Sequence, residues 1–494
     1  MAPEPEGAPP GAGAAARVAA EARTTAEAEA DAAARVAAVA PPAVREILDR
    51  LHEAGHDGWA VGGSVRDALL GRTPADWDLA TDARPDRLME LFPGAVYENR
   101  FGTVAVRTHG SGVVEITTFR SEHDYADFRR PHRVEFGDTV DIDLARRDFT
   151  VNAIAWGRAG TDGQATDEQP NRIEDPFGGL ADLAARRLRA VGDPDARFRE
   201  DALRMVRAVR LAATLEMDVE ERTLAAIGAN AGLVAHLSGE RIGAELEKLL
   251  AAPVPSRGLA LAHDTGLLAV FAPELAAQRG IPQSKAEGED LWDHTLRTVD
   301  AAPQGRPIVR LAALLHDIGK PPTFADGHFH HHEAAGATLA DALLRRLRYP
   351  RTPAEEVVHL VRHHMFIADP SLSDGAIRRF IGRIGRDHLD ALFALRRADD
   401  IGSHADPDDE TGTAFRRRVE AELAAEAALD RYALVISGHD LMRELGLTPG
   451  RRLGQVIDAL TERVVDDPAL NERATLILLA QGILADMDEA PADR

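Results

Sequence analysis

A glycine turn followed by an acidic strand constrains the fold of this chain most strongly. Trp59-Ala60-Val61 reads as a strand that runs into Gly62-Gly63, and residues 64–70 read as a helix that Gly71 ends. Asp76-Trp77-Asp78 follows, and side chains two positions apart lie on the same face of a strand. This order of elements predicts a head of mixed α and β structure with a polar site at the turn.

Asp76 and Asp78 are candidate ligands for a pair of magnesium ions. Hard cations prefer carboxylate oxygens, and two ions can clamp the attacking and leaving oxygens of a phosphoryl transfer. Glycine lets backbone N–H groups approach a triphosphate closely at a helix N-terminus, so the turn suits a nucleotide. An Asp-X-Asp pair alone is more often a solvated loop feature, but the Gly-Gly-Ser turn upstream favours the catalytic interpretation.

A third carboxylate is expected on a neighbouring strand. Residues 103–107 and 113–119 read as a hairpin, and Glu115 stands in it among Val, Ile and Phe residues. A carboxylate in an apolar setting is costly unless it meets a cation or a donor. Glu115 is therefore the predicted third acidic residue of the site, and a solvent-facing position is the alternative.

A candidate for base recognition lies in residues 199–207. Asp201 and Arg204 are three positions apart, so they would share one face of a helix. A carboxylate accepts and a guanidinium donates, which matches the amino group and ring nitrogen of cytosine and adenine but not uracil or guanine. Buried polar groups left unpaired by uracil or guanine can discriminate against the wrong nucleotide by as much as about 10⁴-fold. The alternative is a surface salt bridge worth less than about 1 kcal/mol.

A second candidate site lies in a histidine-rich region between residues 290 and 404. His316 and Asp317 are adjacent on a predicted apolar helix. Further histidines and aspartates occur at His294, 328–332, 363–364 and 399–400. Imidazole and carboxylate together suit Mn, Ni, Zn or Fe better than Mg alone, and such a centre can activate water against a phosphoester. The alternative is that this region has lost its activity and is kept only as a structural scaffold.

Length and composition predict several domains in a soluble protein. The chain has 494 residues and no cysteine, which fits a cytoplasmic location, and no apolar run is long enough to span a membrane. The net charge of −23 argues against broad affinity for nucleic acid, although binding depends on local patches. The expected parts are a disordered Ala- and Pro-rich extension over 1–40, a head over 41–185, a helical neck and body over 186–283, a histidine-rich domain over 284–410, and a helical tail over 411–494.

The motifs together resemble the bacterial class II CCA-adding tRNA nucleotidyltransferases. The resemblance is carried by residues 62–67, 76–78, Glu115 in Glu-Ile-Thr-Thr-Phe-Arg, 146–153 and 200–204, in family order. It implies a polymerase-β-like α+β head with a small mixed sheet, followed by an all-α neck and body, an HD domain and a helical tail. It also implies addition of C, C and A from CTP and ATP to the tRNA 3′ end. The oligomeric state is left open.

The resemblance also implies roles for individual residues. Asp76 and Asp78 would bind Mg²⁺, with Glu115 as a further catalytic carboxylate. The nucleotide would contact Gly62, Gly63, Ser64, Arg66, Arg120, Arg147, Asp148, Asn152, Asp201, Arg204 and Arg207. Residues 120–133 resemble the flexible loop with which the family switches from C to A.

The histidine-rich region resembles the HD phosphohydrolase superfamily, whose members act as phosphatases or cyclic phosphodiesterases. The implied ligands of a transition metal or Mg²⁺ are His294, His316, Asp317, His332, His364 and Asp399. Two rivals share the head, a poly(A) polymerase and an enzyme that adds only A. A third rival is a phosphohydrolase whose head only senses nucleotide or RNA. The Ala-rich N-terminus and the strongly negative net charge depart from the usual family pattern.

Overall fold

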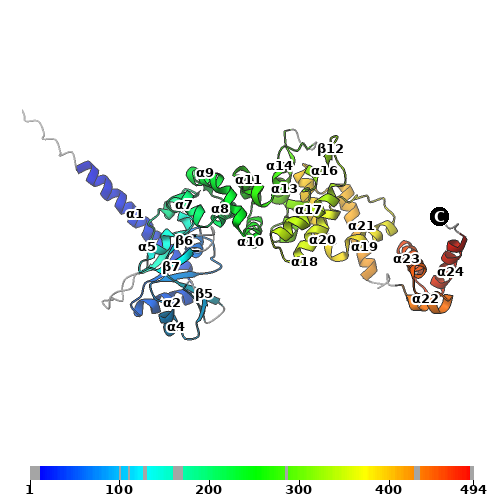
Figure 1. Cartoon of the computed structure of the whole chain (residues 1–494), viewed down its shortest axis with the longest axis horizontal. Coiled ribbons are helices and arrows are strands. Elements are labelled where there is room, and N and C mark those ends of the chain that lie inside the picture. The colour runs from blue at the N-terminus through cyan, green and yellow to red at the C-terminus, as the bar shows by residue number, and fades with distance from the viewer. Residues whose placement is uncertain are drawn as a thin grey trace, which may run out of the picture. The chain divides into compact units, whose positions relative to one another are not determined.

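The computed structural model describes residues 12–99, 102–108, 112–125, 131–158, 171–283, 288–427 and 434–489. The chain divides into two compact units, residues 1–273 and 274–494, and each is described by itself. The first unit, blue to green in Figure 1, combines a sheet with helices, while the second, yellow-green to red, is almost entirely helical. Among the described residues, no helix is both long and apolar enough to cross a membrane.

The first unit is built on a mixed sheet of seven strands in the order β3-β4-β5-β2-β1-β8-β9. β2 and β5 run parallel, and every other neighbouring pair is antiparallel. The strands are β1 Gly58–Val61, β2 Asp78–Thr81, β3 Val96–Asn99, β4 Thr103–Thr108, β5 Gly112–Thr118, β8 Ala155–Arg158 and β9 Arg172–Glu174. The predicted mixed sheet and its β4–β5 hairpin are confirmed.

A separate hairpin of β6 Arg120–Tyr125 and β7 Pro131–Phe136 covers the predicted loop over 120–133, of which residues 126–130 lie outside the described part. The helices of the unit follow the predicted shift from mixed to helical structure. They are α1 Ala12–Val39, α2 Pro42–Glu53, α3 Gly63–Leu69, α4 Pro85–Leu91, α5 Val140–Ala145, α6 Gly179–Ala184, α7 Pro194–Glu200, α8 Leu203–Leu215, α9 Glu221–Asn230, α10 Gly239–Leu250, α11 Pro255–Asp264 and α12 Leu267–Phe271. Short elements are η1 Thr150–Asn152, β10 Arg187–Leu188, β11 Asp218–Val219 and η2 Ala231–His236.

The structure differs from the expected disorder of residues 1–40 over residues 12–40, and residues 1–11 lie outside the described part. Residues 12–39 form α1, and Ala32, Ala33, Val36 and Ala40 are buried where the helix packs on α3 and β9. Alanine has the highest helix propensity, and these positions recur at helical spacing on one face. The small side chains therefore let the helix approach the head closely. The sequence prediction missed this packing because the segment has few large apolar residues.

The second unit is a set of packed helices with one short hairpin. Its helices are α14 Leu291–Ala301, α15 Pro307–Leu315, α16 Lys320–Thr323, α17 His332–Arg346, α18 Arg351–His363, α19 Asp374–Ile384, α20 Arg386–Gly402, α21 Glu410–Ala427, α22 Gly438–Leu445, α23 Arg451–Asp466, η3 Pro468–Leu470 and α24 Arg473–Glu489. α13 Pro273–Ala276 stands at the division between the units. The hairpin of β12 Phe324–Ala325 and β13 His328–Phe329 departs from the expected all-α structure. Asp326 and Gly327 both have positive φ, which makes the tight turn of a two-residue hairpin.

Candidate active sites

The predicted carboxylates of the head meet at the neighbouring strands β2 and β5. Asp78 begins β2 and stands opposite Glu115 of β5 in the parallel register. Asp76 lies just before β2, and the alternation of exposed Asp76, buried Trp77 and exposed Asp78 puts both Asp side chains on one face. All three carboxylates line one cavity of about 830 Å³.

The surroundings of Glu115 differ from the apolar setting expected from its neighbours. Val114 and Ile116 are buried on the opposite face of β5, while Glu115 is exposed and lines the cavity. Strand alternation explains the difference, since adjacent residues point to opposite faces. Although the Asp78 side chain reaches solvent, the protein atoms around its carboxyl group displace water and raise its pKa, and the nearby Asp76 carboxylate adds to this rise against the opposing charge of Arg147. A cation bound beside Asp76 and Asp78 would relieve the repulsion between their charges.

The glycine turn lies beside Arg147. Gly62 has a φ of 78° and precedes α3 as its N-cap residue. A side chain there would place its Cβ 2.7 Å from Nη1 of Arg147, so only glycine fits without displacing the guanidinium. Gly63 begins α3, and the buried Ser64 hydroxyl donates to the carbonyl of Val61 at 3.2 Å. Ser64 therefore stabilises the turn from inside.

A polar network joins the turn to the helical part of the unit. Arg66 Nη1 donates to Asn152 Oδ1 at 2.6 Å, and Asn152 Nδ2 donates to Asp148 Oδ1 at 2.9 Å. Arg207 of α8 approaches Asp148 Oδ2 with Nε at 2.8 Å and Nη2 at 2.7 Å. Burial opposes ionisation of Asp148, yet Arg207 and Asn152 lower its pKa to about 2. The structure thus brings four of the predicted nucleotide-binding residues into one charged network.

The two remaining predicted arginines of the head are Arg147, which lies between α5 and η1, and Arg120 of β6. Arg147 Nη2 donates to Oδ2 of the buried Asp143 at 2.9 Å, which orients the guanidinium toward the turn. Burial would raise the pKa of Asp143, but Arg146 and Arg147 lower it. Arg120 begins β6, opposite Phe136 in the register of the β6–β7 hairpin.

The expectation that Asp201 and Arg204 share one helical face is wrong. α7 ends at Glu200, Asp201 is extended with a φ of −141°, and α8 begins at Leu203. Asp201 Oδ1 accepts a hydrogen bond from the N–H of Leu203 at 3.1 Å. The carboxylate therefore helps to begin α8, as short acidic side chains do at helix N-termini.

Asp201 and Arg204 each have another partner in this structure. Asp201 Oδ2 accepts from Nη2 of Arg241 in α10 at 2.7 Å. Arg204 donates to Glu200 Oε2 and to the carbonyl of Arg146, both at 2.8 Å. Arg241 was not predicted, because it lies 40 residues along the chain from Asp201 and no local pattern joins them.

The six predicted ligands of the second unit converge on one buried centre. His294 lies in α14, His332 begins α17 and Asp399 lies in α20. His316 and Asp317 follow α15, and His364 follows α18. Their ligand atoms form two groups, each within 4.8 Å: His294, His316 and Asp399, and Asp317, His332 and His364.

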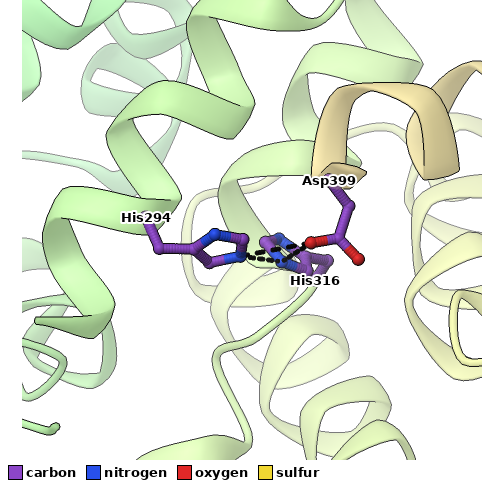
Figure 2. Close-up of side chains that lie close together, drawn as sticks. All are labelled: His294, His316 and Asp399. Carbon is purple, nitrogen blue, oxygen red and sulfur yellow. Dashed lines mark hydrogen bonds and ion pairs between the residues drawn. The ribbon is translucent and has the colours of Figure 1, made fainter. Parts of the chain in front are cut away.

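Figure 2 shows the first group, in which both imidazoles and the Asp399 carboxylate point toward one another. His294 Nε2 lies 3.0 Å from His316 Nε2 and 3.3 Å from Asp399 Oδ1. Asp317 stands between the two groups. Its Oδ2 lies 3.3 Å from His294 Nε2 and 3.1 Å from His316 Nε2, and its Oδ1 lies 3.4 Å from His332 Nε2 and 3.6 Å from His364 Nε2.

Backbone carbonyls orient three of the rings. Nδ1 of His316, His332 and His364 lies 2.8, 3.1 and 2.7 Å from the carbonyls of Ala313, Phe329 and Val361. A carbonyl only accepts, so Nδ1 carries the proton and Nε2 presents its lone pair to the centre, as in metal-ligating histidines. Among the described residues, the buried Nε2 atoms of His332 and His364 have no hydrogen-bond partner. The donor set therefore fits a divalent metal.

The structure also distinguishes His332, His364 and Asp399 from the histidine or aspartate next to each of them in the sequence. His331 is exposed, whereas His332 is buried. His363 packs its ring on His359 at 4.6 Å, and Asp400 Oδ1 accepts from Arg396 at 2.9 Å. His332, His364 and Asp399 are therefore the members of their clusters that face the centre.

Lys320 belongs to the centre and was not predicted. Its buried Nζ lies 2.6 Å from Asp317 Oδ2. Burial opposes ionisation of Asp317, but His316 and Lys320 hold its pKa well below the usual range. The spacing of three residues offered a signal, because it places both side chains on one side of a helical turn.

Comparison with known families gives matches along most of the chain. The profile described as "Poly A polymerase head domain" matches residues 58–189, and the HD domain profile matches residues 291–402. A profile described as "Probable RNA and SrmB- binding site of polymerase A" matches residues 216–279. A profile of tRNA nucleotidyltransferase domain 2 matches residues 418–480.

Individual relatives cover nearly the whole chain. A CCA-adding enzyme from Levilactobacillus brevis is 34% identical over 434 residues, which span 88% of this chain and 96% of the relative. One from Geobacillus kaustophilus is 35% identical over 436 residues, 86% of this chain and 93% of the relative. The crystal structure of the Bacillus stearothermophilus CCA-adding enzyme in complex with CTP is similar with a TM-score of 0.67 and 29% identity, over 91% of this chain and 100% of that one.

Proposed function

The chain belongs to the family of CCA-adding enzymes, and we propose that its nucleotidyl transfer takes place in the cavity beside β2 and β5. The convergence of Asp76, Asp78 and Glu115 on that cavity, next to the glycine turn, carries the proposal. These oxygen ligands suit Mg²⁺. A bound pair of ions would neutralise charge on the attacking and leaving oxygens. The substrates proposed are CTP, ATP and the 3′ end of tRNA, so the enzyme would work in the cytoplasm.

The residues around the turn suit the triphosphate. Arg66 and Arg147 lie at the start of α3, where Gly62 leaves space for the backbone to approach an anion. Asp148 and Asp143 hold arginines of this region in fixed orientations without occupying all of their donors. A guanidinium fixed in this way loses little conformational entropy when phosphate binds.

Asp201 and Arg204 are proposed to read the base. Asp201 accepts one hydrogen bond at each oxygen, from Leu203 and from Arg241, so each oxygen keeps acceptor capacity for an exocyclic amino group. Arg204 is held by Glu200 and offers further N–H groups to a ring nitrogen. UTP and GTP would leave the half-buried Asp201 and the buried Arg204 without matching partners, and this mismatch would be the source of selectivity.

Sequencing of 3′ ends tests the head. A tRNA transcript without CCA is incubated with Mg²⁺, CTP and ATP, with UTP and GTP as competitors. Addition of C, C and A followed by arrest is expected, and the variant with Asp76→Ala and Asp78→Ala should add nothing. A lone A on a CC end would identify an A-adding enzyme, and a long A tract would identify a poly(A) polymerase. Incorporation by the double variant would refute the catalytic assignment.

The HD centre is proposed to be a metal-dependent phosphohydrolase. Its support is the set of six converging ligands, with Nε2 atoms of His332 and His364 that are buried without a hydrogen-bond partner among the described residues. Histidine and carboxylate favour Mn, Ni, Zn or Fe, although Mg²⁺ remains compatible with the carboxylates. A bound ion would activate water and polarise a phosphoester. Lys320 would keep Asp317 ionised and ready to bind.

Two measurements test this second activity. Hydrolysis of a 2′,3′-cyclic nucleotide and of a phosphomonoester should require added metal and vanish in the variant with His316→Ala and Asp317→Ala. Addition of CCA by the same variant should persist, because the head carries that reaction. Loss of the thermal transition together with both activities would instead favour a scaffold role for the centre.

A further inference from the structure

The second unit presents an aromatic pair beside its metal-ligating centre. Phe324 and Phe329 stand directly opposite each other in the β12–β13 hairpin, and their ring centroids lie 5.1 Å apart. Residues paired across two strands lie on the same face, so the two rings form one aromatic surface. Phe324 is 38% exposed, so a further flat group can pack on its ring from the solvent side.

The hairpin is fixed to the centre on both sides of this surface. Before the hairpin, Lys320 Nζ lies 2.6 Å from Asp317 Oδ2 and 5.3 Å from the ring centroid of Phe329. An ammonium group over a ring attracts it, which ties Phe329 to the centre. After the hairpin, Nδ1 of the predicted ligand His332 donates to the carbonyl of Phe329 at 3.1 Å. The aromatic surface therefore has a set position beside two predicted metal ligands.

Contacts lead from the buried centre toward solvent through the series Asp317, Lys320, Phe329 and Phe324. The exposed fraction rises from 2% at Asp317 to 7% at Lys320 and 38% at Phe324. A substrate that reaches the centre from solvent would thus pass the aromatic surface, and the part of it that stays outside would lie against Phe324.

The occupant that fits this series combines a phosphoester with a flat group. The centre is proposed to act on the phosphoester, and the positive charge of Lys320 lies on the side where an anionic phosphate would lie. A sugar or glycerol ester would leave the aromatic surface uncovered. Every nucleobase has a π face that stacks on aromatic side chains, and ribose separates base from phosphate. A nucleotide therefore matches both parts of the site.

We propose that Phe324 and Phe329 form a stacking platform for the base of a nucleotide whose phosphoester lies at the HD centre. The base packs on the exposed ring of Phe324, and Phe329 supports that ring from across the hairpin. Both residues bind substrate and take no part in bond breaking. A free nucleotide and the last nucleotide of an RNA share this chemistry, so the substrate class is a nucleoside phosphate. The inference rests on the proposed phosphohydrolase activity of the centre.

Phe324→Leu tests the platform, with Leu478→Ala as the control. Leucine keeps an apolar side chain but has no flat ring, and Leu478 is a 68% exposed residue of α24. The full chain with Mn²⁺ is given adenosine 2′,3′-cyclic phosphate or glycerol 1,2-cyclic phosphate, which has no base. Water opens one P–O bond in each ester and leaves a phosphomonoester.

The two esters should respond differently to the loss of the ring. Phe324→Leu should raise the KM for the nucleotide at least about fivefold, the lower end of what stacking of one base contributes. The KM for the glycerol ester should change by less than about twofold. Phe324→Tyr restores a flat ring and should match the unchanged protein, as should Leu478→Ala. Equal KM values for the nucleotide in Phe324→Leu and Leu478→Ala, or equal losses with both esters, would overturn the platform.

Photolabelling locates the base independently of turnover. 8-Azidoadenosine 2′,3′-cyclic phosphate is irradiated with the full chain, and the labelled peptides are identified by mass spectrometry. Label is expected in the peptide that contains residues 324–329, and Phe324→Leu should reduce it at least about fivefold. Label found only elsewhere would overturn the platform. Failure of the unchanged protein to cleave either ester would instead refute the phosphohydrolase activity, so the two failures are distinguishable.

An RNA that ends in a 2′,3′-cyclic phosphate distinguishes the two sources of the base. A defect of Phe324→Leu with both the RNA and the mononucleotide would support a platform that serves free nucleotides and RNA ends alike. A defect with the RNA alone, together with label in residues 324–329, would assign the platform to RNA ends. No defect with either substrate would overturn the proposal.

Discussion

Replacement of Asp148 by Asn gives a quantitative test of the polar network in the head. The Asp148 carboxylate is buried and accepts hydrogen bonds from Arg207, Asn152 and the N–H of Phe149. These donors lower its pKa from the ordinary value of 3.8 to about 2. A difference of one unit corresponds to about 1.4 kcal/mol, so the ionised carboxylate stabilises the fold by about 2 kcal/mol at pH 7.

The stabilisation depends on pH with a definite sign. The unfolded chain binds this proton more tightly than the folded chain, so the contribution is complete above about pH 4 and is lost as the pH falls toward 2. At pH 3 the ionised carboxylate retains about 1 kcal/mol of its effect. Asp148→Asn should therefore lower the free energy of unfolding by about 2 kcal/mol at pH 7, and the difference should shrink by about half at pH 3.

Urea unfolding followed by tryptophan fluorescence measures this difference. Trp59, Trp77 and Trp156 lie in the head and Trp292 in the second unit, so a Trp292→Phe background reports on the head. Asp138→Asn is the control, because Asp138 is 88% exposed and its loss should change stability by less than about 0.5 kcal/mol. Equal destabilisation at pH 7 and pH 3, or none at either, would refute the role assigned to the Asp148 carboxylate.

Three further substitutions follow from close contacts. Gly62→Ala should abolish nucleotide addition with loss of about 1–2 kcal/mol of stability, measured by primer extension and thermal unfolding, because φ is 78° and a Cβ would meet a guanidinium. Gly319→Ala should unfold the HD centre, because the added Cβ would lie 2.1 Å from the carbonyl of His332. Calorimetry should then detect no binding of Mn²⁺, and intact binding would contradict the expected unfolding. Arg241→Ala should release Asp201 and raise misincorporation of UTP relative to CTP, read by sequencing of products, and unchanged selectivity would show that the pair has no role in base recognition.

Sequence patterns predicted the elements that carry the sites. The strand, turn and helix around Gly62 and the β4–β5 hairpin stand where alternation and glycine placed them. The same alternation, applied to Glu115, would have placed its side chain on the face of β5 opposite to the buried Val114 and Ile116. Local spacing succeeded where regular structure continued through the motif. It failed at Asp201, where the helix breaks and the carboxylate begins the next one.

The sequence by itself determined which chemical groups the chain offers, the α+β head, the helical remainder and the family. The tertiary structure alone decided contacts that no sequence pattern indicated. It brought Arg241 to Asp201 and Lys320 to Asp317, and it packed α1 so that the corner between α1 and α2 borders the carboxylates. The physical reason is range. Periodicity reports backbone geometry over a few residues, whereas a site forms from contacts between segments whose separation along the chain leaves no local trace.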